Sequence, residues 1–113
     1  GIGLDGADLQ ESSLVGTTLE GAHLVNADLR GADLTGADLT DADLQHARLE
    51  GANLSGAVLR GARLTRARLM GAELCGADFT NAIMSAANFK DATVCADTVW
   101  PLSGPPSTLD APP

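Results

Sequence analysis

The chain has 113 residues, of which 44% are hydrophobic and 3% aromatic, and its formal net charge is −8 at pH 7. This length fits one domain, and the acidic balance argues against direct binding to nucleic-acid phosphates, which requires positive charge. No stretch approaches the ~18–20 apolar residues of a membrane-spanning helix, and no signal-peptide pattern opens the chain, so we expect no membrane insertion.

A five-residue cycle runs through nearly the whole chain. Its clearest part, residues 26–62, reads NADLR GADLT GADLT DADLQ HARLE GANLS GAVLR GA. An apolar residue recurs every five positions from Leu4 to Val99, usually with an alanine two residues before it. We expect the apolar residues to form the core, and its central members are Leu29, Leu34, Leu39, Leu44, Leu49, Leu54, Leu59 and Leu64.

A period of five excludes the common regular structures. On a straight α-helix the leucines would wind around the axis, and on a straight strand they would alternate between faces. Within one cycle, however, alanine and leucine share a face of a short extended piece. The chain must then bend at the next two residues, where glycine often supplies a positive φ. A chain that bends in the same sense every five residues closes after about four bends and climbs as a square, parallel β-solenoid.

The tandem A-[DN]-L-x-x pattern resembles the pentapeptide repeat family over about residues 4–100. Membership implies an all-β fold, a right-handed quadrilateral parallel β-helix with four repeats per coil and about five coils here. We expect residues 1–100 to form this domain, with 1–20 as an imperfect first coil. Residues 79–102 are expected to form the last coil and its cap, and 103–113 a flexible proline-rich tail.

The first coil departs from the pattern at its inward alanine positions, which are Ile2, Ser12 and Thr17. Degenerate terminal repeats are typical of solenoids. The unpaired strand edges of this coil invite pairing. We therefore expect an upstream segment or a second copy to cover them, and the latter predicts an end-to-end homodimer.

Residues twenty apart should stack in ladders on the outside, which places Asp28 by Arg48 and Asp43 by Arg63. The charge lies in bands: residues 1–50 have net −8, residues 51–70 have +4 and residues 71–113 have −4. We expect the arginines of residues 60–68 to pair with acids on neighbouring coils. The candidate acidic face for a partner consists of Asp28, Asp33, Asp38 and Asp43.

The apolar positions become bulkier toward the C-terminus, beginning at Phe79, and Asp97 interrupts the inward alanines. Prolines follow, and they cannot continue a hydrogen-bonded ladder. We predict that Val99, Trp100 and Leu102 form a lid over the end of the core.

Cys75 and Cys95 lie twenty residues apart, each directly after a core position. They should stack on adjacent coils with Cα atoms near 5 Å apart, a distance that suits a disulfide. Whether the bond forms depends on the compartment. A bonded pair favours a periplasmic or thylakoid-lumen-like space, and free thiols favour the cytoplasm.

No catalytic, metal or cofactor site is predicted. His23 and His46 occupy different parts of the cycle and do not converge into a ligand set. A nucleophilic triad needs a cleft, and a rod packed with leucine and alanine offers none. We therefore expect no enzymatic activity and no pocket inside the column.

The favoured function is a non-enzymatic structural or protein-binding module with an unidentified protein partner. One alternative is an acidic mimic of DNA that inhibits a type II topoisomerase, as the resemblance implies for some family members. Another is a repeat segment of a larger signalling or membrane-associated protein, since the chain starts at Gly1 and not at methionine. The fold also predicts that Leu49→Lys is far more damaging than Glu50→Lys.

Overall fold

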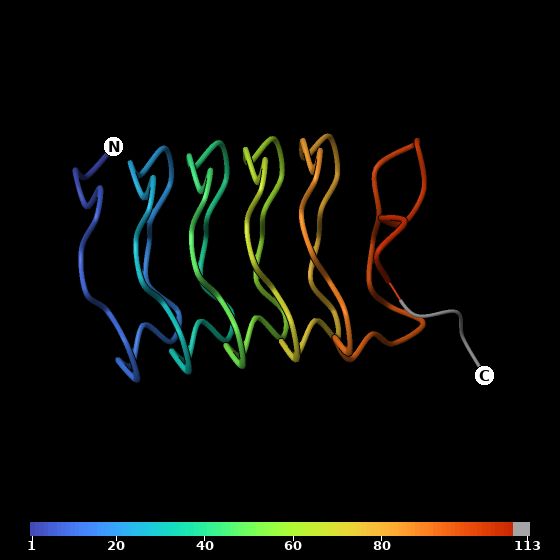
Figure 1. Cartoon of the computed structure of the whole chain (residues 1–113), viewed down its shortest axis with the longest axis horizontal. Helices are drawn as coiled ribbons and strands as arrows, with labels where there is room; N and C mark the ends of the chain where they lie inside the picture. Colours follow the sequence, from blue (N-terminus) through green and yellow to red (C-terminus); the bar gives the residue numbers. More distant parts are fainter. Residues whose placement is uncertain (110–113) are drawn as a thin grey trace.

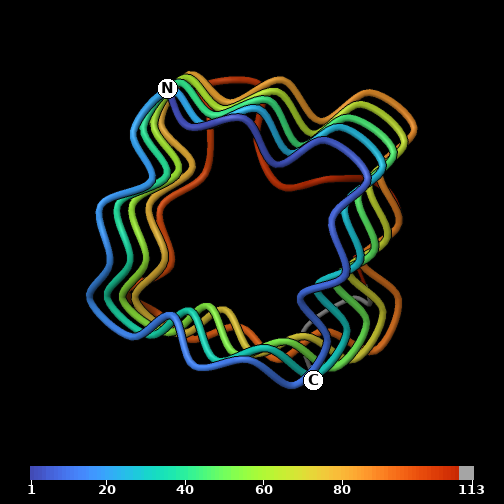
Figure 2. The ribbon, with the colours of Figure 1, turned by 90° about the vertical axis from the view of Figure 1, so that its left-hand side faces the viewer.

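The computed structural model describes residues 1–109 and winds them into a rod of square cross-section. Figure 1 shows the coils stacked side by side, and Figure 2 shows the four-sided outline seen along the rod. The rod measures 37 × 24 × 23 Å along its principal axes. Residues twenty apart lie beside one another in parallel, as in the bridges from Ser13 to Asp33 and from Asp33 to Asn53. The predicted parallel β-solenoid is confirmed.

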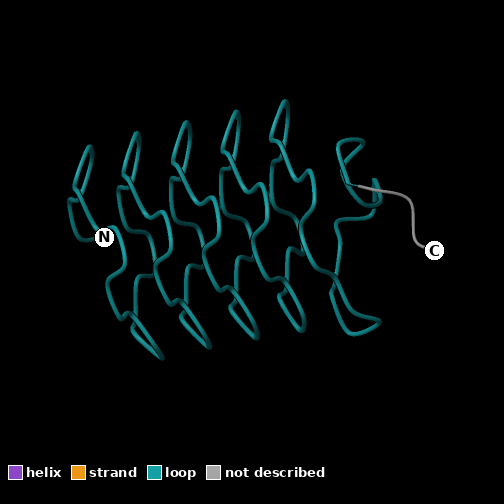
Figure 3. Cartoon of the chain, turned by 60° about the horizontal axis from the view of Figure 1, so that its bottom comes forward, coloured by secondary structure: helices purple, strands orange, loops and turns teal. Residues whose placement is uncertain are grey.

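Each side of a coil pairs with the next coil through one residue. The N–H of Leu34 donates to the carbonyl of Asn53 at 2.7 Å, and the N–H of Asn53 donates to the carbonyl of Ala32 at 2.9 Å. Because the chain turns again after this residue, the bridges stay isolated and residues 1–109 contain no helix and no longer strand. Figure 3 therefore draws residues 1–109 as loops.

The corners depend on a left-handed backbone at every fifth residue. From Gly6 to Asp91 these residues have φ between 58° and 74°, and eight of them are not glycine. One is Ala86, whose φ of 60° costs an L-residue about 1–2 kcal/mol. The corner closes when the next inward N–H donates back to the preceding core carbonyl, as from Ala32 to Leu29 at 3.0 Å. The regular bending expected from the period of five is thus a repeated tight turn.

The core is a continuous column. All eight leucines named as its central members are fully buried, and so are the inward alanines from Ala22 to Ala77. Removing one such leucine side chain from water stabilises the fold by about 1.5–3 kcal/mol. Phe79 and Phe89 continue the column toward the C-terminus and are also fully buried.

The first coil tolerates polar residues at inward positions because their hydroxyls find acceptors. Ser12 Oγ donates to the carbonyl of Leu9, and Thr17 Oγ1 donates to the carbonyl of Leu14, both at 2.7 Å. On the outer edge of this coil, the N–H of Asp8 has no acceptor within residues 1–109. The expected end-to-end pairing with a second copy stays a prediction.

The register shifts by one residue in the last coil, which corrects the positions predicted for Val99 and Asp97. Asp78 bridges to Val99 and not to residue 98, so Val99 faces outward and is 45% exposed. Thr98 occupies the inward position in place of Asp97, and its hydroxyl donates to the carbonyl of Leu74 at 2.8 Å. The same hydroxyl accepts from the N–H of Cys95 at 3.1 Å, which fixes the extra residue in the turn.

The cap also differs from the predicted lid. Trp100 takes the core position and stacks on Phe79, with ring centroids 5.1 Å apart and planes 8° from parallel. It meets Phe89 edge-on at 5.9 Å. Leu102, in contrast, is fully exposed and caps nothing. The large aromatic ring covers more of the column than the valine beside it, so burial favours the shifted register.

Residues 103–109 are not the expected free tail. The side chain of Thr108 takes the place of a further coil, because its hydroxyl accepts from the N–H of Phe89 at 3.0 Å and donates to the carbonyl of Ala87 at 2.9 Å. Leu109 packs against the core, half-buried. The rest of the predicted tail, residues 110–113, lies outside the described residues.

Thr108→Val is expected to destabilise the protein by about 1–3 kcal/mol, because it leaves the Phe89 N–H and the Ala87 carbonyl without partners under a cap. Ser107→Ala deletes a neighbouring hydroxyl that makes no hydrogen bond to the described part of the chain, and it should be nearly neutral. Urea unfolding followed by tryptophan fluorescence measures both, since Trp100 lies in the cap. Equal midpoints for the two variants would contradict the role given to Thr108.

Candidate functional site

The outside of the rod carries all candidate functional side chains, because the column inside is filled. Outward residues form one ladder on each side. The Asp28 side consists of Asp8, Asp28, Arg48, Arg68 and Asn88, and the Arg63 side consists of Gly3, His23, Asp43, Arg63 and Ile83. The other two ladders pass through Asp33 and Asp38.

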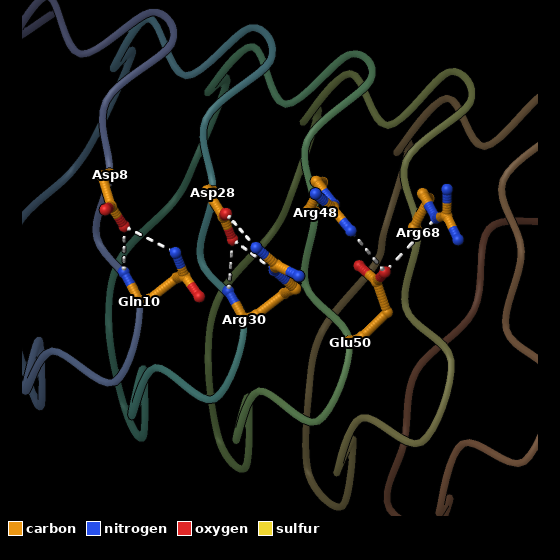
Figure 4. A network of polar contacts seen from close by, with 7 residues as sticks. All are labelled: Asp8, Gln10, Asp28, Arg30, Arg48, Glu50 and Arg68. Atoms are coloured by element: carbon orange, nitrogen blue, oxygen red, sulfur yellow. Dashed lines mark hydrogen bonds and ion pairs between the residues drawn. The ribbon is translucent and has the colours of Figure 1, made fainter.

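The Asp28 side holds the most connected polar network (Figure 4). Arg30 donates from Nε and Nη2 to the two carboxylate oxygens of Asp28, at 2.9 and 2.7 Å. Further along, Glu50 lies between two arginines, 3.8 Å from Arg48 and 3.3 Å from Arg68. Side chains held in this way present a fixed charge pattern, negative at one end of the ladder and mostly positive farther along.

Glu50 is therefore a poor choice for the mild variant in the comparison of Leu49→Lys with Glu50→Lys. Its side chain is only 22% exposed, and its Oε1 and the Nε of Arg48 are buried without hydrogen-bond partners among residues 1–109. A lysine at residue 50 would add a third positive charge between Arg48 and Arg68. Like charges in such contact are unfavourable, so Glu50→Lys changes more than a free surface.

Aspartate and asparagine at the outward positions have a structural task at the corners. The Oδ1 of Asp33 accepts from the backbone N–H of Thr35 at 3.1 Å and from its hydroxyl at 2.6 Å. The backbone part of this contact, from the N–H two residues later, recurs along the rod. It occurs at Asp8, Asp28, Asp33, Asp38, Asp43, Asn53, Asp78 and Asn88. These residue types form such turns readily, which explains why they alternate with alanine and leucine.

The hydrogen bonds at the corners also lower the pKa values of aspartate side chains. Hydrogen bonds from the Thr35 hydroxyl and backbone lower the pKa of Asp33, and those from Thr40 lower the pKa of Asp38. The side chain of Arg30 lowers the pKa of Asp28. A carboxyl group with a lowered pKa in the folded state stabilises the fold only while it is ionised.

Acid should therefore weaken the rod below about pH 4, where the same carboxyl groups take up protons in the unfolded chain. The contribution of Asp33 and Asp38 is fully present above that pH and disappears as the pH falls through their lower folded pKa values. A Thr35→Val and Thr40→Val double variant should lose less stability between neutral pH and pH 3 than the wild type. Guanidinium unfolding at each pH measures this.

Ser55→Ala is the matched control for that experiment, because its outward partner Asn53 does not titrate. It should show the same acid dependence as the wild type. If the threonine double variant did so too, the hydroxyl bonds would not be the source of the acid dependence.

The four residues of the predicted acidic partner face do not share one side of the rod. Asp28, Asp33, Asp38 and Asp43 belong to four different ladders and therefore point to four sides of the rod. The reason is the corner after every five residues, which turns consecutive carboxylates away from one another. They form a ring around the acidic half of the rod.

The arginines of residues 60–68, which we call the arginine belt, pair only partly as expected. Arg63 lies 3.9 Å from Asp43, as the ladder predicted, and Arg60 reaches Asp78 at 2.6 Å. Asp28, however, binds Arg30 in its own corner and not Arg48. The arginines of these pairs are exposed to solvent, so each pair contributes only about 0–1 kcal/mol.

The two cysteines are joined in a disulfide, with Cα atoms 4.7 Å apart. The histidines lie apart, His23 on the Arg63 side and His46 at a corner with φ of 61°. Within residues 1–109 no group of three histidine, cysteine, aspartate or glutamate side chains is placed to hold a metal ion.

A family model for pentapeptide repeats matches the chain in 8 copies, over residues 4–41, 37–74 and 59–94. The chain belongs to the pentapeptide repeat family. The quadrilateral β-helix of this family is right-handed, and the coils described above have its four sides and its period of five. Among residues 1–109, no helix has the length and apolarity needed to cross a bilayer.

Solved structures match this chain to different degrees. The crystal structure of Rfr23 from the cyanobacterium Cyanothece 51142 is 35% identical, with a TM-score of 0.82, over 83% of this chain and 64% of that one. HetL, involved in heterocyst differentiation regulation in Nostoc sp. PCC 7120, is 28% identical with a TM-score of 0.41, over 80% of this chain and 60% of that one. A trypsin-treated form of QnrB1, a plasmid-mediated fluoroquinolone resistance protein, is 18% identical with a TM-score of 0.36, over 83% and 78%.

This pentapeptide repeat chain thus spans less than two thirds of the length of Rfr23 and of HetL. No curated protein matches it.

Proposed function

We propose that this pentapeptide repeat protein is a non-enzymatic scaffold that binds a partner protein through its outer surface. The observation that carries the proposal is the filled column, in which the core leucines from Leu24 to Leu74 are fully buried. Such an interior leaves no room for a substrate, so recognition falls to the outward ladders. Pentapeptide repeat proteins are typically structural or interaction modules, which supports the same assignment.

The outward side chains are suited to this task because many are already held in place. Asp28 is fixed by Arg30, and Glu50 lies between Arg48 and Arg68. A surface whose side chains are ordered before binding loses less conformational entropy when a partner binds. Interfaces are also assembled from complementary charge, and this rod offers acidic and basic bands on one rigid body.

Four single variants, each on a different side of the rod, test the proposal. They are Arg63→Glu, Arg68→Glu, Glu73→Arg and Val58→Arg, all at outward ladder positions. The immobilised wild-type rod captures partners, and calorimetry then measures the affinity of the captured protein for each variant. We expect one side, or two adjacent sides, to weaken binding at least about tenfold, since interface energy concentrates in a few residues.

Thermal unfolding of each variant is the control for folding, and the variants on the remaining sides are the control for specificity. Equal affinity of all four variants would contradict binding through the ladders. So would the absence of any partner with a Kd below about 10 μM, near the weak limit of useful recognition.

The DNA-mimic hypothesis gains no support from the arrangement of the carboxylates. They ring the rod, they accept hydrogen bonds from their own corners, and the arginine belt interrupts them. The proposed function therefore predicts that micromolar protein leaves DNA supercoiling by gyrase unchanged. Dose-dependent inhibition in that assay would favour mimicry instead.

A further inference from the structure

Within residues 1–109, the last coil leaves backbone groups unpaired, and those on the Arg63 side lie beside a cavity. Within residues 1–109, the N–H groups of Met84 and Ala86 and the carbonyl of Ala82 have no hydrogen-bond partner. We call residues 82–86 the Met84 edge. It belongs to the Arg63 side, where Ile83 is 50% exposed.

The coil before it shows what such an edge binds. Leu64 N–H donates to the carbonyl of Ile83 at 2.7 Å, and the N–H of Ile83 donates to the carbonyl of Ala62 at 2.9 Å. Arg66 N–H donates to the carbonyl of Ser85 at 3.0 Å. The three open groups of the Met84 edge repeat this pattern, so they match an extended segment of three residues.

A cavity of about 330 Å³ lies over this edge, between residues 82–85 and residues 103–106. Within residues 1–109 the far wall makes none of the missing bonds, and it is poor in donors for the carbonyl of Ala82. Pro105 and Pro106 have no N–H, and the N–H of Gly104 already donates to the carbonyl of Pro101 at 2.8 Å. The volume falls within the range of about 300–1,000 Å³ typical of ligand sites.

We propose that this cavity is a binding slot for an extended segment of a partner protein, which joins the Met84 edge as one further strand. Adding a strand to an open sheet edge is a general mode of peptide recognition. The central residue of the guest donates to the carbonyl of Ala82 and accepts from the N–H of Met84. The residue two positions later accepts from the N–H of Ala86.

The same register defines the side chains of the guest. Its central residue lies outward beside Ile83, so a β-branched or other aliphatic side chain suits this position. The residues on either side of it point inward, one over Ala82 and the other over the half-buried Met84. A small residue and a longer aliphatic one fit these two places, in the order found in the repeats of the rod itself.

Charge adds a preference for acidic guests. The residues that line the slot carry no charge, whereas Arg63 and Arg66 lie on the coil directly below, and Arg66 makes no ion pair within residues 1–109. A carboxylate after the aliphatic residues of the guest comes to the corner near Arg66.

A strand fits the slot and a whole coil does not. The neighbouring sides of this end are closed by Thr108, which takes both backbone bonds next to Phe89, and by Trp100 over Phe79. A second copy stacking its first coil here would meet these residues. The occupant is therefore a single extended segment. This inference rests on the proposed protein-binding function and names one site for it.

The test uses the ¹⁵N-labelled chain and the blocked peptide acetyl-Ala-Val-Leu-Glu-Asp-Ser-amide. We expect the amide signals of Met84 and Ala86 to shift on titration and their hydrogen exchange to slow. The same peptide with an N-methylated valine cannot donate to the carbonyl of Ala82. It should bind at least about tenfold more weakly, the equivalent of one lost hydrogen bond in a desolvated site.

Two variants complete the design. Met84→Pro removes the central donor at an edge where proline is tolerated, and it should abolish binding. Arg66→Glu should weaken the acidic peptide but not a version with lysine in place of its two acids. If Met84→Pro does not fold, the N-methylated peptide answers the same question on the unaltered protein.

The proposal is overturned if the amides of Met84 and Ala86 do not respond to millimolar peptide, or if the N-methylated peptide binds equally well. It is also overturned if sedimentation shows a dimer that protects these two amides, because a second copy then fills the slot. If the slot proposal fails, the proposed protein-binding function still stands for any partner whose affinity is lowered by one of the four ladder variants. The two proposals can therefore be overturned independently.

Discussion

Leu49→Lys is expected to abolish cooperative folding of the rod, or to lower its melting temperature by about 20 °C or more. Leu49 is fully buried in a column that contains only apolar neighbours. A lysine there loses the leucine packing, worth about 2–5 kcal/mol, and buries an unpaired ammonium at a further cost of several kcal/mol. The total approaches the whole stability of an ordinary domain, about 5–15 kcal/mol. Thermal unfolding followed by circular dichroism measures it.

Ser55→Lys is the matched control, because it introduces the same charge one repeat further along at a corner. The side chain of Ser55 makes no hydrogen bond within the described residues, and Ser55 lies half-buried beside the exposed Gly56. We expect a change within about 0.5 kcal/mol. Leu49→Ala should fall between the two, which separates the packing loss from the charge. Similar melting temperatures for the two lysine variants would show that the leucines do not line a dry column.

The fold was predictable from one regularity, because a period of five admits few backbone solutions. Once the chain has to bend at the residues between Leu29 and Leu34, the ladders and the buried leucines follow. The stacking of Cys75 on Cys95 follows from the same count of twenty residues per coil. Local turn chemistry and the global path agree here, as they do in sequences that specify one structure.

The structure differs from the prediction where the sequence supported two local conformations about equally. Val94 and Val99 are both apolar and five residues apart, so the cycle alone placed Val99 inside. Burial of the larger Trp100 ring between Phe79 and Phe89 decided otherwise. The extra residue this requires is accommodated by the hydroxyl of Thr98, and no pattern of apolar residues contains that information.

The sequence near the C-terminus does contain a signal for the last pairing, but the prolines beside it favoured the prediction of a tail. Thr108 lies twenty residues after Asn88, and Leu109 lies twenty after Phe89, so both keep the coil count. The prolines before them favoured a tail, since proline cannot join a ladder through its nitrogen. The structure meets this constraint by using the Thr108 side chain as the pairing group.

The error in the acidic face has a similar origin. Asp28 and Asp33 look adjacent because they are adjacent in sequence, yet each corner turns the next carboxylate to another side. The residues that do share a side are twenty apart, as Asp28 and Arg48 are. Sites on this solenoid therefore have to be sought along the ladders and at the two ends, and the open Met84 edge could not be located without knowing which side the cap leaves free.

Loss of the disulfide is expected to destabilise the rod by about 3 kcal/mol, because the bond closes a loop of twenty residues in the unfolded chain. Its position makes the effect largest in the last coil. At the preceding corners, from Gly6 to Gly71, the turning N–H bonds the next coil, as Gly56 does to the carbonyl of Cys75 at 2.9 Å. The Gly76 N–H has no such acceptor within residues 1–109, because the register shift moves the chain away.

The disulfide thus holds the final coil where its backbone ladder is interrupted. Urea unfolding with and without dithiothreitol measures the effect, and hydrogen exchange should show residues 93–100 opening first under reduction. A Cys75→Ser and Cys95→Ser double variant is the control: it should match the reduced wild type and ignore the reductant. A wild-type midpoint unchanged by dithiothreitol, together with two titratable thiols before reduction, would show that the bond does not form and that packing of Trp100 alone secures the coil.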